Sequence, residues 1–189
     1  MALTTERLVL RRFTAEDADA VFTLLRDREV NTFLPWFPME TPKEAGAFLR
    51  DNLLSPGECG GTYCAVCLRE HPGPVGYLHL SADDSHDFGY ALRKEYWHRG
   101  IVTEAGAAFL EQVRKAGIPY ITATHDVHNP RSGEVMKRLG MTYRYSYEEQ
   151  WQPKNKQVVF RLYQRNFDGQ DDRTYAKYWD CLLYTSRCV

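Results

Sequence analysis

"EYWHRGIVTEAGAAFLEQ", residues 95–112, is the stretch that decides the fold of this chain. Aromatic and basic residues and one glycine stand directly before a helix that is predicted from Thr103 to Ala116 and ends at Gly117. A strand is predicted on either side of it, over residues 87–93 and 120–127. A strand–helix–strand unit makes a right-handed parallel crossover, which brings the carboxyl end of the first strand to the start of the helix. Ligands of open α/β sheets gather there.

The start of this helix has the chemistry of an anion site. Backbone N–H groups of residues 98–103 have no partner within the helix, and the helix dipole adds positive potential. Basic side chains nearby add charge: Arg93, Lys94, His98 and Arg99. The sequence contains neither GxGxxG nor GxxxxGK[ST], which excludes the usual dinucleotide and nucleoside-triphosphate loops. The spacing alone equally supports a structural interpretation, in which Tyr96 and Trp97 pack in the core and Gly100 only turns the chain.

The other elements are predicted from periodicity, caps and turn residues. Two helices are expected early in the chain, one after the capping box of Thr14 and Asp17 and one after Thr41. A third helix begins at Asn129 and ends at Gly140. Further strands are expected over residues 7–13, 63–69, 75–81, 142–147 and 157–163, with a turn at 71–74. Residues 31–38, NTFLPWFP, are predicted to form a loop. Its large apolar side chains either cover a site or fill the space beneath the loop.

Length and composition favour one globular domain, which we place at residues 1–167 with an extension at 168–180. The chain has 189 residues, of which 43% are hydrophobic, and a net charge of −1. This balance argues against a nucleic-acid partner. The sequence has no signal-like or membrane-spanning apolar run, so we expect a cytoplasmic protein without a membrane partner.

The five cysteines do not indicate a metal site or a disulfide framework. Cys64 and Cys67 lie near His71, a spacing that also occurs in metal sites. We favour a strand instead, in which residues three apart point to opposite faces. The last nine residues, Cys181 to Val189, resemble the translation of a sequencing-library adapter, and we expect this tail to be non-native.

Three segments in the same order carry a family resemblance. They are "TERLVLRRFTAEDADAV" at 5–21, "DFGYALRKEYWHRGIVTEA" at 87–105 and "HNPRSGEVMKRLGM" at 128–141. Together they resemble the GNAT superfamily of N-acetyltransferases, and most closely its ribosomal-protein-alanine N-acetyltransferase branch. The resemblance implies an α/β (α+β) fold: a mixed, twisted, mostly antiparallel sheet with one splayed parallel strand pair, flanked by helices.

The resemblance also implies acetyl-coenzyme A as donor, with its pyrophosphate on the amides of His98 to Thr103 and its thioester carbonyl near Leu92. The implied cofactor-binding residues are Leu92, Arg93, His98, Arg99, Gly100, Ile101, Val102, Thr103 and Asn129, with no metal. Two residues depart from the family. Val102 stands where glycine or alanine is usual, and Met136 stands where many members have a tyrosine that protonates the leaving thiolate. Asn129 is alternatively an ordinary N-cap.

The implied activity is transfer of an acetyl group to a primary amine, either a protein N-terminus or a small amine, by direct attack. Asp87 matches the family's general base and Ser132 is the suggested acid, although an exposed strand end and a local backbone binder are their ordinary alternatives. Other proton acceptors are His79, His86, His125 and His128. Glu104 matches the family motif but also suits any first helical turn. Residues 33–38 and the hairpin 143–163 are expected to line the acceptor side.

Two other classes of protein stay open from the sequence. An acyl-coenzyme A sensor would keep the fold without the chemistry, and Val102 and Met136 support it. A structural or partner-binding protein would use residues 33–37, FLPWF, as an exposed patch.

Overall fold

The computed structural model describes residues 2–54 and 61–178, and these form two antiparallel sheets. The first has five strands in the order β1-β2-β3-β4-β5 and the second has three in the order β6-β8-β7. The strands of the first sheet are β1 (Leu3–Thr4), β2 (Leu8–Arg11), β3 (Thr62–Leu68), β4 (His71–Leu80) and β5 (Phe88–Leu92). Those of the second are β6 (Tyr120–Asp126), β7 (Thr142–Trp151) and β8 (Lys156–Asn166).

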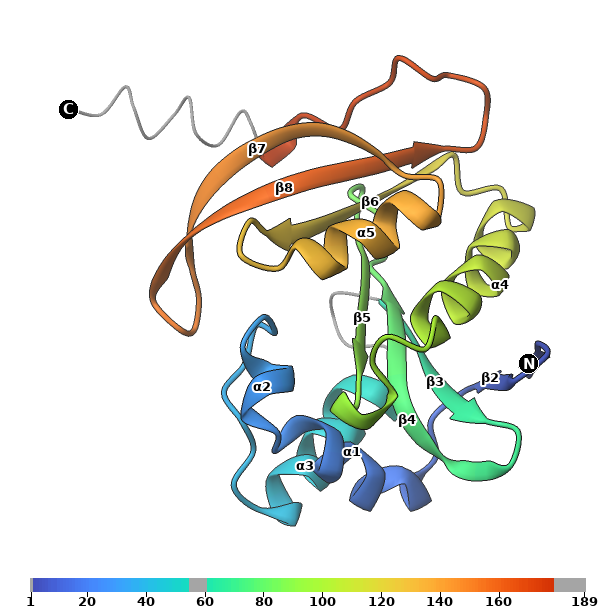
Figure 1. Ribbon diagram of the computed structural model, residues 1–189, viewed down its shortest axis with the longest axis vertical. Coiled ribbons are helices and arrows are strands. Elements are labelled where there is room, and N and C mark those ends of the chain that lie inside the picture. The colour runs from blue at the N-terminus through green and yellow to red at the C-terminus, as the bar shows by residue number, and fades with distance from the viewer. Residues whose placement is uncertain (1, 55–60, 179–189) are drawn as a thin grey trace.

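The two sheets meet at one parallel bridge, which pairs Asp87 with Thr122. Next to it the Thr122 amide donates to the His86 carbonyl at 3.3 Å. Beyond this point β5 and β6 diverge, as Figure 1 shows at the centre of the molecule. The expected mixed, mostly antiparallel sheet with one splayed parallel pair is therefore confirmed.

Helices cover both faces of the first sheet, which is why its strands alternate between two apolar cores. On one face α4 (Ile101–Lys115) and α5 (Pro130–Arg138) pack against a cluster that includes Phe88 and Leu92. On the other face α1 (Ala18–Leu25) and α3 (Pro42–Phe48) pack against a cluster that includes Tyr77 and Ala91. Figure 1 shows α1 to α3 gathered at one end of the molecule, away from α4 and α5. None of the described helices is both long and apolar enough to cross a membrane.

The caps and turns of the helices account for most of their limits. Thr41 caps α3, and its Oγ1 accepts the Glu44 amide at 3.3 Å. A π-helical turn η2 (Leu49–Leu54) then continues α3. The first predicted helix begins with a 3₁₀ turn η1 (Ala15–Asp17), where Asp17 Oδ2 accepts the Thr14 amide at 2.8 Å. A further 3₁₀ turn η3 (Lys94–Tyr96) precedes α4, which begins two residues earlier than predicted.

One short helix was missed. The sequence prediction placed a loop at residues 31–38, but α2 (Arg28–Asn31) occupies the start of this range. Asp27 caps α2, because its Oδ1 accepts the amides of Glu29 and Val30. A helix of four residues carries too little periodicity to be recognised from the sequence.

Some strand limits were also wrong. The predicted turn at 71–74 lies inside β4, and the chain turns at Arg69 and Glu70 instead. Proline at 74 is tolerated there because the register shifts twice between β3 and β4, next to Cys67. Both strands of the last hairpin are longer than predicted, and the strand predicted over 7–13 ends at Arg11.

The prediction that Cys64 and Cys67 lie on a strand and point to opposite faces is confirmed. Cys67 is buried in the core on the α1 side, whereas Cys64 packs against the core on the α4 side. Both are free thiols, and the described residues contain no group of three or more metal-ligating side chains. The predicted foreign tail at 181–189 lies outside the described residues.

Two glycines give a matched test of this packing. A Cβ at Gly76 on β4 would lie 2.3 Å from the Ala91 carbonyl of β5, whereas a Cβ at Gly46 within α3 meets nothing within 4 Å. We expect Gly76→Ala to lower the free energy of unfolding by about 1–3 kcal/mol, because the backbone of β5 must move. Gly46→Ala should raise it by about 1 kcal/mol through helix propensity. Urea unfolding measures both, and equal effects from the two substitutions would contradict the packing of β4 on β5.

Candidate active site

A cleft of about 1190 Å³ lies where β5 and β6 diverge. Its walls come from both sheets, from the N-terminal ends of α4 and α5, and from the loop that follows α2. The cleft therefore occupies the place that the sequence predicts, next to the carboxyl end of β5 and the start of α4.

Backbone groups of β5 and β6 face this opening. In an antiparallel ladder, alternate residues direct their N–H and C=O groups to the same neighbour. The Arg93 amide bonds the Val75 carbonyl and the Ser81 amide bonds the Asp87 carbonyl, so the odd residues of β5 pair with β4. The amides of Phe88, Tyr90 and Leu92 consequently point toward β6, from which β5 has separated.

The start of α4 has the geometry of an anion site. His98 and Gly100 both have positive φ, at 61° and 71°, and α4 begins at Ile101 without a side-chain cap. A left-handed residue at this position favours glycine because a Cβ adds strain. The unpaired amides at the start of the helix therefore face the cleft, which His98 and the residues from Gly100 to Thr103 line.

An ion pair fixes this turn to the edge of the first sheet. Arg7 donates from Nε to Glu104 Oε2 at 2.6 Å and from Nη1 to the Arg99 carbonyl at 2.9 Å. Glu104 also accepts from Thr5 Oγ1 at 2.6 Å. Glu104 therefore holds the helix start against the segment before β2.

Two of the basic side chains that were expected to add charge to the cleft contact other residues instead. The guanidinium groups of Arg93 and Arg99 each lie 5.6 Å from the ring of Tyr96. Arg93 also pairs with Glu95. Neither arginine is among the described residues that line the cleft, although Leu92 and the helix-start residues are. Trp97 Nε1 donates to the Leu92 carbonyl at 2.8 Å, which anchors the loop.

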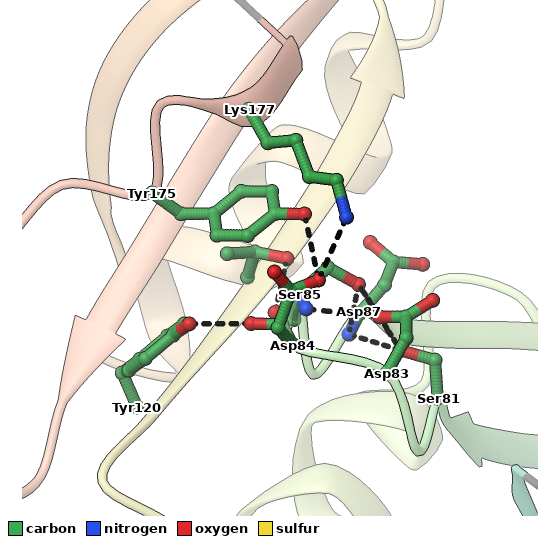
Figure 2. Close-up of polar contacts among 9 residues, drawn as sticks. Ser81, Asp83, Asp84, Ser85, Asp87, Tyr120, Tyr175 and Lys177 are labelled. Carbon is green, nitrogen blue, oxygen red and sulfur yellow. Dashed lines mark hydrogen bonds and ion pairs between the residues drawn. The ribbon is translucent and has the colours of Figure 1, made fainter.

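Asp87 lies at the bridge between the sheets and lines the cleft. Its amide donates to Ser81 Oγ at 2.7 Å, and Asp83 accepts from the same serine and from Ser85 (Figure 2). Asp87 Oδ1 is buried and has no hydrogen-bond partner. Burial, with a smaller contribution from the charge of Asp83, raises the pKa of Asp87 to about 7. Asp87 is thus a half-buried residue whose Oδ1 is enclosed and whose pKa is raised, not an exposed strand end.

Ser132 lies on the other side of β5 and has a partner that the sequence did not reveal. The hydroxyl of Tyr90 lies 2.7 Å from Ser132 Oγ and donates to the Ser132 carbonyl at 2.9 Å. Burial raises the pKa of Tyr90, so its hydroxyl stays protonated at neutral pH. Met136 is fully buried in the core beside them and lines the cleft without a polar group.

The remaining candidates differ in their contacts. Asn129 lines the cleft and makes no side-chain capping bond to α5, so the N-cap interpretation fails for its side chain. Val102 also lines the cleft and is only half-buried.

The four candidate histidines differ in exposure. His128 is exposed and pairs with Asp126, while His86 packs on the ring of Tyr120 and does not line the described cleft. Burial lowers the pKa of both His79 and His125, which line the cleft as neutral rings.

Sequence reasoning missed Tyr90 and Tyr178, both of which line the cleft. Tyr90 follows Asp87 by three residues, and the alternation of a strand would have placed it on the opposite face. Glu149 lies in the hairpin 143–163 that was expected beside the site, whereas Tyr178 comes from the C-terminal extension, which no local motif connects with β5.

Comparison with known proteins agrees with this geometry. Residues 7–142 match the model of the acetyltransferase (GNAT) domain. The uncharacterized N-acetyltransferase YnaD of Bacillus subtilis is 28% identical over 145 residues, which cover 75% of this chain and 82% of YnaD. Its relative YoaA, from the same organism, is 24% identical over 143 residues, covering 73% and 81%.

Solved structures share the fold. A GNAT-family acetyltransferase from Bacillus anthracis superposes with a TM-score of 0.77 at 22% identity, covering 89% of this chain and 99% of that one. RimL, a ribosomal L7/L12 α-N-protein acetyltransferase solved with coenzyme A, has a TM-score of 0.78 at 17% identity, covering 90% and 100%. Since the domain model spans more than half of the chain, and its region contains the helix-start turn and the divergent strands, the chain belongs to the GNAT acetyltransferase family and is an acyltransferase.

Proposed function

We propose that the protein transfers the acetyl group of acetyl-coenzyme A to a primary amine by direct attack of the amine. The observation that carries this proposal is the opening between β5 and β6, which has backbone amides along its edge, Asp87 on one face and Ser132 on the other. A donor entering from the α4 side and an acceptor entering from the α1 side meet in such an opening.

The residues present suit coenzyme A. The unpaired amides at the start of α4, with the helix dipole, suit its pyrophosphate. The edge amides of β5 suit its amide-containing arm and the carbonyl oxygen of the thioester. We assign donor binding to Leu92, His98, Gly100, Ile101, Val102, Thr103 and Asn129, with Arg93 and Arg99 acting on the loop through Tyr96. The donor supplies an acetyl group on a thioester, whose sulfur leaves as a thiolate.

Asp87 is the proposed base. Above its pKa of about 7 its carboxylate takes a proton from the ammonium form of the acceptor, which leaves a free amine. The amine nitrogen then bonds to the acetyl carbon, the carbon–sulfur bond breaks, and the nitrogen releases its second proton to solvent as the amide forms. The amides of Tyr90 and Leu92 stabilise the carbonyl oxygen as it gains charge.

Ser132 is the proposed acid, with Tyr90 as the group that positions it at 2.7 Å. The Ser132 hydroxyl delivers a proton to the departing sulfur and regains one from solvent through the open cleft, while Tyr90 keeps its own proton. The loss of the usual tyrosine at Met136 is tolerable, because general-acid help contributes about 10²–10⁴-fold and a thiolate, with a thiol pKa near 8.5, departs readily.

The acceptor is a primary amine in this proposal. RimL acts on the α-amino group of a ribosomal protein, and the same class of nucleophile suits a site with a carboxylate base. We place the enzyme in the cytoplasm, where the free thiols Cys64 and Cys67 stay reduced.

Thiol release tests the function directly. The purified chain, given acetyl-coenzyme A and a panel of primary amines, should release free thiol in an amine-dependent manner, and mass spectrometry should find the acetylated amine. Thermal stabilisation by the donor without turnover of any amine would instead identify a sensor. Neither effect would identify a protein that does not use this cleft.

The helix-start model predicts unequal effects of neighbouring substitutions on coenzyme A binding. Arg99→Ala should weaken binding only modestly, since its side chain lies on Tyr96. Gly100→Pro should weaken it far more, because proline removes an amide and cannot adopt the φ of 71°. Calorimetric titration of variants with wild-type melting temperatures measures both, and equal losses would count against the model.

The assignment of Asp87 predicts a change in pH dependence. Wild-type turnover of one amine should rise as pH increases through about 7, where Asp87 loses its proton. Asp87→Asn should abolish this rise and should approach the wild-type rate only at higher pH, where the free amine form needs no base. A pH–rate profile measures this, and an unchanged profile for Asp87→Asn would move the base to another group.

Ser132→Ala is the matched comparison in the same profile. Its defect should be nearly independent of pH, because departure of the thiolate does not depend on the charge of the acceptor. Its size should not exceed the range of general-acid help, about 10²–10⁴-fold. Tyr90→Phe should give a smaller defect of the same shape.

A further inference from the structure

The C-terminal segment, residues 173–178, brings Tyr178 into the wall of the cleft. Tyr178 stacks on Tyr147 of β7, with ring centroids 5.1 Å apart and planes inclined by 17°. Tyr147 in turn packs on Phe160, and Trp151 packs on the same ring. All four rings line the cleft, so this end of it is aromatic.

The segment is held in place by a buried glutamine. Gln164 on β8 is fully buried, and its Oε1 accepts the Tyr175 amide at 2.7 Å while its Nε2 donates to the Arg173 carbonyl at 3.0 Å. Tyr145 adds a bond to the Tyr175 carbonyl at 2.7 Å. Outside the cleft, Lys177 and Tyr175 reach Asp84, each at 3.3 Å (Figure 2). These hydrogen bonds therefore fix the position of the segment that carries Tyr178.

Two carboxylates share this end of the cleft with the rings. Asp87 and Glu149 line the cleft together with Tyr147 and Tyr178, and burial and the charges of both carboxylates raise the pKa of each tyrosine hydroxyl. Glu149 is an exposed residue of β7, and partial desolvation raises the pKa of its carboxyl group. The Oδ1 atom of Asp87 is buried without a partner. A buried acceptor atom beside a second carboxylate suits a hydrogen-bonding cation.

The arginines among the described cleft-lining residues lie on another face. These arginines, Arg131 and Arg138, belong to α5 on the opposite face of β5. At the hairpin tip Lys154 donates to the Asn31 carbonyl and lies over the Trp151 ring, so it closes the gap to α2. Across the cleft Trp36 presents a buried Nε1 without a partner.

Resting on the N-acetyltransferase function proposed above, we propose that the acceptor is a small primary amine with an aromatic body and no carboxylate beside the amine, and that Tyr178 determines this specificity. The ammonium group pairs with Asp87 and Glu149, and the body lies against Tyr178, Tyr147 and Trp151. An ammonium near such rings gains cation–π attraction as well. An amino-acid acceptor would instead bring its own carboxylate against two others, a repulsive arrangement that rejects it.

Matched amines test this class. Phenethylamine and phenylalanine differ by one carboxylate, and phenethylamine and ethylamine differ by one ring. We expect kcat/KM for phenethylamine to exceed that for each of the other two at least about tenfold, since one well-placed group is worth roughly 10–200-fold in discrimination. Equal turnover of phenylalanine, or of a tripeptide with a free N-terminus, would overturn the proposed class.

Substitutions of Tyr178 test whether this residue determines the specificity for aromatic amines. Tyr178→Ala should raise the KM for phenethylamine about tenfold, by the same measure of discrimination, while the KM for acetyl-coenzyme A and the turnover of ethylamine stay near wild type. Tyr178→Phe should keep the wild-type KM. Tyr143→Ala is the matched control, because Tyr143 is exposed on β7 and does not line the described cleft. An equal loss for all amines in Tyr178→Ala would show only a structural role and would overturn the assignment.

A separate readout distinguishes failure of this inference from failure of the proposed function. If no amine releases thiol, the acetyltransferase proposal fails. Calorimetry then measures whether phenethylamine binds to the chain saturated with coenzyme A. Binding that is lost in Tyr178→Ala and kept in Tyr143→Ala would still support the proposed acceptor pocket. Absence of such binding in the wild-type chain would overturn it.

Discussion

The single bridge between Asp87 and Thr122 is the constraint on which the rest of this structure depends. It joins the two sheets at one end of β5 and β6. The remaining backbone groups on the facing edges of these strands have no partner strand, because β5 and β6 pair with β4 and β8 on their other edges. Unpaired backbone groups in a protein interior are costly unless a ligand or water satisfies them. The divergence of β5 from β6 therefore creates both the cleft and the hydrogen-bonding groups that give it chemistry.

The alternation of β5 separates the proposed acid from the proposed base. Successive residues of β5 alternate between two faces, so Asp87 lies on the α1 side while Tyr90 reaches Ser132 on the α5 side. One strand thus places a carboxyl group and a pair of hydroxyl groups on its two opposite faces. Asp87 also lies at the junction of the sheets, and the burial that results there raises its pKa into the range in which a base operates.

The second sheet brings distant parts of the chain to the cleft. Its face toward the first sheet carries Tyr147, Glu149 and Trp151 from β7, and the buried side chain of Gln164 docks the C-terminal segment beside them. This face has its own apolar cluster, separate from the two cores of the first sheet. The α4 end of the cleft thus offers backbone amides at a helix start, while the β7 end offers rings and carboxylates.

The sequence by itself determined the local parts of this protein. The α4 start with Gly100, the strand that contains Asp87 and the short helix with Ser132 were all predictable, because helix caps, glycine turns and strand alternation act over a few residues. Their chain order also gave the parallel crossover and the place of the cleft. Only the tertiary structure decided that Arg93 and Arg99 lie on Tyr96, that Tyr90 contacts Ser132, and that Glu149 and Tyr178 complete the pocket. Some of these contacts join residues that are far apart in the chain, and others depend on which of several partners a flexible side chain meets. Local periodicity predicts neither kind of contact.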